Sequence, residues 1–596
     1  MTWEQKDGTG RSSRFHRASL GILVTALLAT VAMPLSHATA AEPTVVTTTG
    51  TFTAVPSPSE AGVDVFFGIR YAAAPEGALR WTPPQAPVPP AGTVVASIPG
   101  NACPQSGSTA PLAQSEDCLF LNVFVPASAR PDSNLPVFYW IHGGALVSGT
   151  GAQYDPSVMV ARGNIIVVTI NYRLGTLGWL AEPGLTASTA SFFENVGDSG
   201  NYGLMDQQFG MQWVQANIKA FGGDPTKVTI GGESAGGLSV SGHLASTTTA
   251  VGLFRGGIIE SGGYMLHSVP SQQSYADVFG PGFDAAVGCT PPADGACLRS
   301  QPATKLIAVQ DQVFGFNGIS PNFSTRILPQ GLQQAFSTGE IIRVPVLQGS
   351  NANEGRLFEP GEIPFSGSFA AVTAAGGPAN FDLANPNTFC ATPAGTPQTC
   401  TYPQEIGLFL AELGLPAILN TPAFGAALAT EYPLANFPDP FLPNNAPTAD
   451  EALGQIFTDV AFSCNVLDSN KDLARWVPVY AYEFNDPSAP AMGSVIAAPN
   501  DQFGYPTASE HAAELQFLFA SGTPLSVDEQ RLAIEMKTYW ENFIISGSPN
   551  IGTERLFFAP WPEFKFLNAI QNLVPGPTLP QPFLTFPVEH FCSTWE

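Results

Sequence analysis

Charged residues are scarce in this chain, and basic ones are the scarcest. Asp, Glu, Lys and Arg make up 12% of the 596 residues, against about 25% in average soluble proteins. The 23 basic residues are outnumbered by 48 acidic ones, which gives a formal net charge of −25. Such a surface repels nucleic acids and anionic membranes, so we expect neither as a partner.

Metal-binding patterns are also missing. The chain has no C-x-x-C motif, and its seven histidines and eight cysteines form no cluster with the ligand spacing of a zinc site. We therefore expect no metal and no other cofactor.

A hydrophobic run long enough to span a membrane is absent too. Three arginines (Arg11, Arg14, Arg17) precede an apolar run from Leu20 to Leu35, and Ala38-Thr39-Ala40 follows as a small-x-small cleavage site. The alternative is a membrane anchor, but the run is short for one and Pro34 interrupts it. The sequence predicts a signal peptide over residues 1–40, a secreted or periplasmic protein and no stable membrane anchor.

Export makes the cysteines candidates for disulfides, because oxidising compartments preserve them. Eight cysteines allow about a hundred pairings, and their spacing favours one. Three pairs lie no more than 15 residues apart and leave two cysteines for the fourth. The predicted bridges are Cys103–Cys118, Cys289–Cys297, Cys390–Cys400 and Cys464–Cys592.

Buried strand-like runs alternate with helix-like stretches along residues 41–596. The runs are Leu135 to Ile141, Asn164 to Tyr172, Val228 to Ile230, Gly257 to Ile259 and Val344 to Leu347. Helical patterns include Asp206 to Ala220 and Ser526 to Ser546. This alternation predicts an α/β fold with a large, mostly parallel sheet and helices on both faces. We expect one catalytic domain, with a helical insertion over the active site at about 360–450.

The most informative segment is Val228-Thr229-Ile230-Gly231-Gly232-Glu233-Ser234-Ala235-Gly236. A β-prone run enters a serine that has glycine two residues before and after it, and a helix-compatible segment follows. This is the G-x-S-x-G nucleophile elbow, in which a sharp strand-to-helix turn exposes the serine hydroxyl. The sequence therefore predicts Ser234 as a nucleophile.

A serine nucleophile needs a base, and the base needs an acid that holds its tautomer. In chains with this elbow the order is serine, acid, histidine. Two of the seven histidines lie in the signal segment. Of three others, two precede any acid that could follow Ser234 and one lies on the helix after the elbow. His590 is two residues from Cys592, whose disulfide would hold it in a structural role. His511 remains as the predicted base. Glu354, just past a strand-like run, is either its acid or an ordinary loop glutamate.

The developing negative charge needs backbone N–H donors. His142-Gly143-Gly144-Ala145 follows the strand-like run that ends at Ile141, as in an HGG-type oxyanion loop. We predict the N–H groups of Gly144, Ala145 and Ala235 as the donors.

Several longer segments resemble the type-B carboxylesterase/lipase family, which includes cholinesterases and bacterial carboxylesterases. They are Gly200-Asn201-Tyr202-Gly203-Leu204-Met205-Asp206-Gln207, Phe221-Gly222-Gly223-Asp224-Pro225, Glu116-Asp117-Cys118-Leu119-Phe120-Leu121-Asn122-Val123 and the G-x-N-x-x-E-G around Glu354. The resemblance runs from about residue 45 to 596.

The resemblance implies an α/β-hydrolase fold and Glu354 as the triad acid. It implies the disulfides above, with Cys390–Cys400 as a local addition. It also implies a buried network of Glu233, Ser261 and Glu514, whose carboxylates we expect to stabilise the imidazolium. Glycine is frequent in the family where Ala145 stands, a departure that a backbone donor tolerates.

These features predict a secreted serine carboxylic-ester hydrolase with a Ser-Glu-His triad, an acyl-enzyme intermediate and a small-molecule ester as substrate. Alternatives of the same fold are a lipase, polyester hydrolase or amide/carbamate hydrolase. The alternative of another class is a non-catalytic binding or adhesion protein. The Cys103–Cys118 loop is short and has no tryptophan, which argues against choline specificity and strong interfacial activation. No pattern in the sequence indicates an oligomeric state.

Overall fold

The computed structural model describes most of residues 43–595. It omits 108, 110, 186–198, 264–268, 315–317, 359–389, 392–396, 399–401, 404–405, 407–409, 411–421, 438–448, 491–507, 521, 551–557, 565–568, 577–578 and 582–584. The predicted signal peptide, much of the predicted insertion and Cys400 lie outside the described residues. The division into a signal peptide and one catalytic domain stays a prediction.

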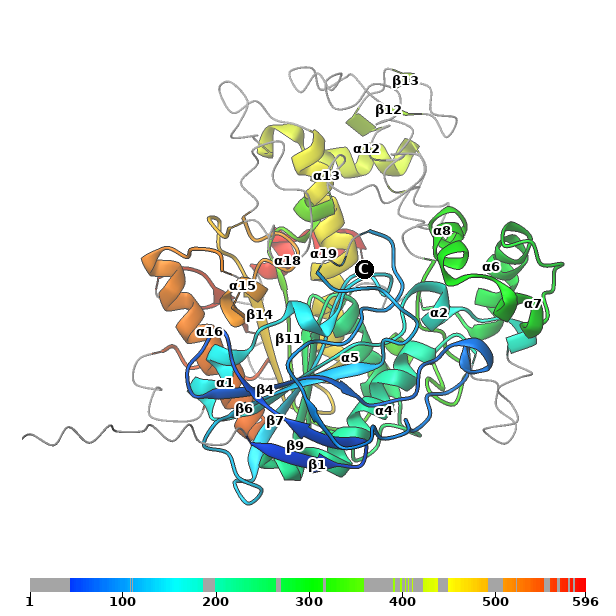
Figure 1. Ribbon diagram of the computed structural model, residues 1–596. Coiled ribbons are helices and arrows are strands. Elements are labelled where there is room, and N and C mark those ends of the chain that lie inside the picture. The colour runs from blue at the N-terminus through cyan, green and yellow to red at the C-terminus, as the bar shows by residue number, and fades with distance from the viewer. Residues whose placement is uncertain are drawn as a thin grey trace, which may run out of the picture. The chain divides into compact units, whose positions relative to one another are not determined.

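A twisted sheet runs through the centre of the molecule (Figure 1). Among the described residues eleven strands form it, in the order β16-β15-β14-β11-β10-β9-β7-β8-β6-β4-β3. In that order they are Leu579–Gln581, Ile570–Leu573, Val479–Phe484, Val346–Asn351, Gly256–Glu260, Gly223–Glu233, Leu135–Ile141, Ile166–Ile170, Phe120–Pro126, Val63–Arg70 and Val55–Pro56.

The middle of this sheet is parallel and its edges are antiparallel. Every neighbouring pair from β15 to β8 is parallel, whereas β16, β6, β4 and β3 join antiparallel. The predicted mostly parallel sheet is confirmed, and each predicted strand-like run overlaps an observed strand. Because the carboxyl ends of parallel strands share one edge, residues that follow β9, β11 and β14 meet there.

Strand β7 shows why helices cover both faces. Val137, Tyr139 and Ile141 pack into one apolar layer, while Phe138 and Trp140 pack into the other. Alternate side chains of a strand point to opposite faces, so a strand that is apolar throughout must be buried on both.

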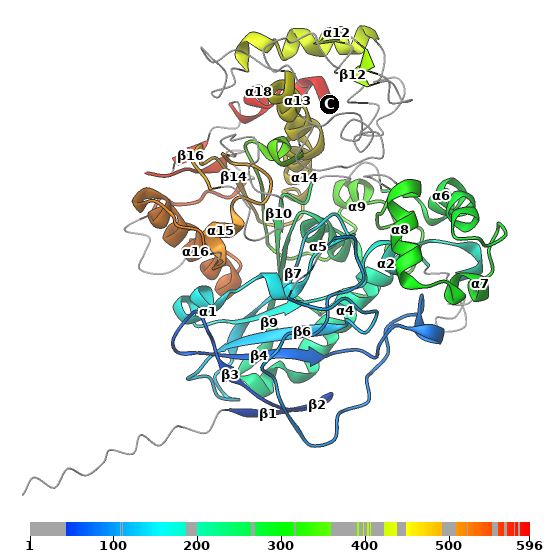
Figure 2. The same cartoon turned by 45° about the horizontal axis from the view of Figure 1, so that its top comes forward.

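Helices α4 and α5 lie on one face, and α1 and α16 on the other (Figures 1 and 2). Their bounds are Tyr202–Asn217, Ala235–Ala245, Ser157–Gly163 and Val527–Ser546. The last begins at a capping box in which Ser526 and Glu529 satisfy each other's backbone N–H groups. Sequence and structure agree on this helix because its start signal is local.

Further helices extend from the core. They are α2 (Gly175–Trp179), α6 (Gln272–Ala286), α7 (Gly295–Ser300), α8 (Ala303–Phe314), α9 (Leu332–Thr338), α12 (Pro422–Glu431), α13 (Ala449–Phe457), α14 (Cys464–Leu473), α15 (Leu515–Leu518), α18 (Phe586–Glu589) and α19 (Cys592–Trp595). Between α13 and α14 the chain forms a π-helical turn, η7 (Thr458–Ser463). Two small sheets complete the described strands: β1 (Thr44–Thr47), β2 (Gly50–Thr53) and β5 (Thr93–Val95) form one, and β12 (Cys390–Ala391) and β13 (Pro397–Gln398) the other.

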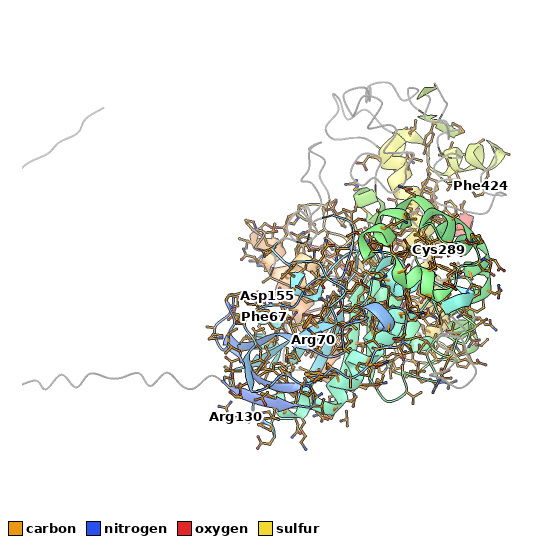
Figure 3. The ribbon with its side chains drawn as sticks, turned by 45° about the vertical axis from the view of Figure 1, so that its right-hand side comes forward. Phe67, Arg70, Arg130, Asp155, Cys289 and Phe424 are labelled. Atoms are coloured by element: carbon orange, nitrogen blue, oxygen red, sulfur yellow. A yellow bond between two sulfur atoms is a disulfide. The ribbon has the colours of Figure 1, made fainter. Side chains whose placement is uncertain are left out.

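Helices α12 and α13 lie beyond one end of the sheet (Figures 1 and 2). Phe424 of α12, labelled in Figure 3, packs edge-on against Trp595 of α19, with 6.1 Å between the ring centroids. A small apolar cluster that includes Tyr432 and Ile456 joins α12 to α13. This part of the chain therefore packs on the C-terminal helices.

Three of the four predicted disulfides are present: Cys103–Cys118, Cys289–Cys297 and Cys464–Cys592. Figure 3 labels Cys289 among the helices α6 to α8. The fourth, Cys390–Cys400, stays a prediction, because Cys400 lies outside the described residues. No helix in the described part of the chain is long and apolar enough to cross a bilayer.

Candidate active site

Ser234 occupies the turn between β9 and α5. Its backbone angles are φ 55° and ψ −121°, which a serine adopts only when its surroundings enforce them. A Cβ on Gly236 would lie 2.0 Å from the Ile141 carbonyl oxygen, and one on Gly232 would lie 2.5 Å from the Gly236 carbonyl carbon. The Ser234 N–H donates to the Glu260 carbonyl at 2.8 Å. The two glycines are therefore required for the strand and helix to approach this closely.

Glu354 begins the short helical turn η4 (Glu354–Phe358) directly after β11. It is fully buried, and both carboxylate oxygens have partners. The Asn351 N–H donates to Oε1 at 2.7 Å, and His511 Nδ1 lies 2.6 Å from Oε2. An acceptor in this position keeps the proton on Nδ1 and leaves Nε2 available as a base.

His511 lies in the turn before α15, with its side chain 4% exposed. Its Nε2 is 3.1 Å from Oε1 of Glu233, the residue before the serine. The ring is therefore directed at the elbow. The Ser234 hydroxyl makes no hydrogen bond among the described residues. In enzymes without substrate, the hydrogen bond between a catalytic serine and its histidine is commonly long, and it shortens in the substrate complex.

The loop after β7 has an unusual backbone. Gly144, Ala145 and Leu146 have φ of 99°, 52° and 62°. Within the described residues no acceptor receives the N–H groups of Gly144, Ala145 or Ala235. A Cβ on Gly143 would lie 3.1 Å from the Ser234 Cβ, so this loop is in contact with the elbow. Free N–H donors next to a serine hydroxyl are what an oxyanion requires.

The His142 ring stabilises this loop through two contacts. Its Nδ1 is 2.8 Å from the Gly143 carbonyl, and its ring stacks on Tyr172 with 4.4 Å between centroids. Burial lowers the pKa of His142 to about 4. The imidazole is neutral at ordinary pH and acts as a packing element.

Of the three predicted network residues, Glu233 contacts His511, and Glu514 is connected to Glu354 through Asn351. Burial, followed by the charges of Glu514 and Glu354, raises the pKa of Glu233 well above its usual value. Burial likewise raises the pKa of Glu514. Burial thus favours the neutral form of both acids, and the expectation that their carboxylates stabilise the imidazolium stays a prediction. The Ser261 hydroxyl is buried and has no partner in the part of the chain that the structure describes.

Asn351 is a site residue whose role the sequence did not indicate. Its side-chain amide donates to the Glu510 carbonyl at 2.7 Å and to Glu514 Oε2 at 2.5 Å. Its backbone N–H binds Glu354, so one residue connects the acid, the network and the chain next to His511. The only signal was its position three residues before the acid.

The described residues include no group of three or more His, Cys, Asp or Glu side chains arranged to hold a metal ion. The geometry offers a buried imidazole held by the Glu354 carboxylate, with its other nitrogen at Glu233, the residue before a strained serine.

Comparisons with known proteins identify the family of this chain. The model of the carboxylesterase family matches residues 41–573. The chain is 31% identical to an acylcarnitine hydrolase of Mus musculus over 518 residues, which is 83% of this chain and 80% of that protein. It is also 31% identical to the cocaine esterase of Homo sapiens, over 83% of this chain and 81% of that protein. Among solved structures, a thermophilic PNB esterase is similar with a TM-score of 0.68 and 25% identity, covering 93% of this chain and all of that one.

Proposed function

Since the chain belongs to the carboxylesterase family and is a carboxylic ester hydrolase, we propose that it works through a Ser234–Glu354–His511 triad and an acyl-enzyme intermediate. The observation that carries the proposal is the 2.6 Å contact between Glu354 Oε2 and His511 Nδ1, on a ring whose other nitrogen is directed at the elbow.

In the first half-reaction, Ser234 Oγ attacks the acyl carbon of the ester while His511 Nε2 takes the hydroxyl proton. Glu354 holds the ring and balances the charge of the imidazolium. The N–H groups of Gly144, Ala145 and Ala235 stabilise the tetrahedral oxyanion. The intermediate then collapses, the ester C–O bond breaks, and His511 returns the proton to the departing alcohol.

In the second half-reaction, water attacks the acyl carbon of the Ser234 ester and gives a proton to His511. The bond to Oγ breaks, the serine regains its proton, and the carboxylic acid leaves. In other hydrolases, removing one oxyanion donor lowers kcat about 100- to 1,000-fold. The three N–H groups that have no acceptor among the described residues therefore support this route.

The decisive experiment compares two serines of the same strand–helix unit. We expect Ser234→Ala to abolish hydrolysis of p-nitrophenyl butyrate and labelling by a fluorophosphonate. Ser246→Ala is the matched control, because the hydroxyl of this buried serine at the end of α5 donates to the Gly242 carbonyl and to no other described residue. Activity retained by Ser234→Ala at the control level would contradict the proposal.

The proposed substrates are small, dispersed esters. The short Cys103–Cys118 loop supports this, because it offers little material for a lid. A rate series with p-nitrophenyl esters of increasing acyl length, below and above the emulsion threshold, tests it. A rate jump when the substrate emulsifies would favour a lipase instead.

We propose that the protein is exported. The predicted signal over residues 1–40 and the three disulfides among the described residues support an oxidising destination. Mass spectrometry of the protein recovered from outside the cytoplasm should give a chain that begins at Ala41. A full-length chain with reduced cysteines in the cytoplasm would refute this.

A further inference from the structure

His590 connects the C-terminal helices to the rest of the enzyme through two carboxylates. It lies between α18 and α19 with its ring 4% exposed, Nδ1 2.7 Å from Asp459 Oδ1 and Nε2 2.7 Å from Glu483 Oε1. An ionised carboxylate only accepts hydrogen bonds, so a ring held on both sides by ionised acids carries a proton on each nitrogen. The side chain is therefore a buried imidazolium between two acids.

The surroundings favour the charged form. Burial alone would lower the pKa of His590, but the charge of Asp459 and the hydrogen bonds of Asp459 and Glu483 raise it to about 10. Among the described residues, the other groups in contact with Asp459 and the His590 ring are neutral: Tyr432 donates to Asp459 Oδ2 at 2.8 Å, Gln455 donates to Oδ1 at 2.7 Å, and the Phe586 ring packs on His590.

The first carboxylate belongs to an element that touches the acid and the base. Asp459 lies in the π-helical turn η7, and turns of this kind are frequent at functional sites. Its neighbour Thr458 accepts the Gly355 N–H at 2.9 Å, one residue after Glu354. Phe462, which follows Asp459 by three residues, packs its ring against the His511 ring with 4.9 Å between centroids.

The second carboxylate belongs to the strand that supports the same loop from the other side. Glu483 of β14 pairs with Ser350 of β11. The next carbonyl, that of Phe484, accepts the Ala352 N–H at 2.9 Å, two residues before Glu354. Both elements joined by His590 thus hold the loop that carries the acid.

We propose that His590 is a positioning residue for the reaction: by joining Asp459 of η7 to Glu483 of β14, it fixes the loop of Glu354 and the Phe462 ring against His511. This inference rests on the proposed roles of Glu354 and His511. His590 touches no reacting atom and acts through the two elements. Without its charge, two buried carboxylates would face each other uncompensated and η7 would move away from β14.

The test uses the full mature chain with His590→Gln, which removes the charge and keeps a hydrogen-bonding side chain. The matched control is Glu116→Gln, which breaks the ion pair of Glu116 with Arg80, also largely buried. Denaturant midpoints, kcat, KM and the pH dependence of kcat are measured for both with p-nitrophenyl butyrate. We expect His590→Gln to lower kcat roughly tenfold or more, because small misplacements of reacting groups are costly, and to shift the acidic limb of the pH profile while KM changes little.

Glu116→Gln should leave that limb unchanged even at a similar loss of stability. Equal effects of the two variants, or a wild-type kcat and pH profile in His590→Gln, would overturn the proposal. If His590→Gln does not fold, Asp459→Asn is read the same way, with a smaller loss of the same sign because His590 keeps Glu483. Loss of activity in Ser234→Ala establishes the serine nucleophile separately, so failure of the positioning role leaves the proposed function intact.

Discussion

A methyl group on Gly143 would lie 2.6 Å from Glu233 Oε2 and 2.9 Å from the Glu233 carbonyl oxygen. Contacts this short would force the loop after β7 away from the turn that carries Ser234. We expect Gly143→Ala to fold but to lose about 100-fold or more in kcat, the cost of a misplaced oxyanion donor. Gly242→Ala in α5, whose Cβ would meet only Leu204 at 3.5 Å, should keep near wild-type kcat. Near-normal kcat in Gly143→Ala would mean that the loop adjusts freely.

Ala145 adopts φ 52°, a left-handed conformation that costs a non-glycine residue about 1–2 kcal/mol. We expect Ala145→Gly to raise the free energy of unfolding by up to about 1 kcal/mol, since glycine relieves strain but gains freedom in the unfolded chain. Ala285→Gly, at an exposed position of helix α6, should lower it by about 1 kcal/mol. Urea unfolding curves compare the two; equal destabilisation would argue against strain at Ala145.

The buried carboxyl group of Glu260 makes the free energy of unfolding fall as pH rises. Burial raises its pKa to about 8, although a hydrogen bond from Trp540 Nε1 at 2.7 Å opposes this. A pKa raised on folding means that the contribution to stability is complete below the unfolded pKa of about 4.3 and is lost as pH rises through about 8. Glu260→Gln removes the titration, so we expect it to gain on the wild type by up to about 1.4 kcal/mol for each pH unit within that window. Parallel stability curves from pH 4 to 9 would contradict this.

The two disulfides Cys464–Cys592 and Cys289–Cys297 should differ in what they contribute. They close loops of 128 and 8 residues. Chain-entropy arguments give about 5 kcal/mol for the long loop and about 2.5 kcal/mol for the short one. We expect the double alanine variant of the long-range bridge to unfold at lower denaturant than that of the short bridge. The reverse order would show that the C-terminal segment stays in place without the covalent link.

Local signals explain what was predictable. The elbow around Ser234, the helix that begins at Ser526 and the apolar runs of β7 and β10 are each specified by neighbouring residues, so they were identified without coordinates. The raised pKa values of Glu233 and Glu514 could not be read from the sequence, because they depend on burial and on the charges of neighbouring carboxylates in the folded chain. The contacts of His590 with Asp459 and Glu483 were not predicted, because these partners are 131 and 107 residues away in the chain.

The sequence by itself determined the chemistry available: a serine at a strand-to-helix turn, a glycine-rich loop, few histidines and a mostly parallel α/β sheet, all written in local patterns. Only the tertiary structure decided which distant groups act together. Glu354 and His511 are 157 residues apart in the chain, and they meet because the segments after β11 and β14 emerge at the same edge of the sheet. Burial at that edge then decides which acids are charged, because the cost of charge depends on the folded surroundings.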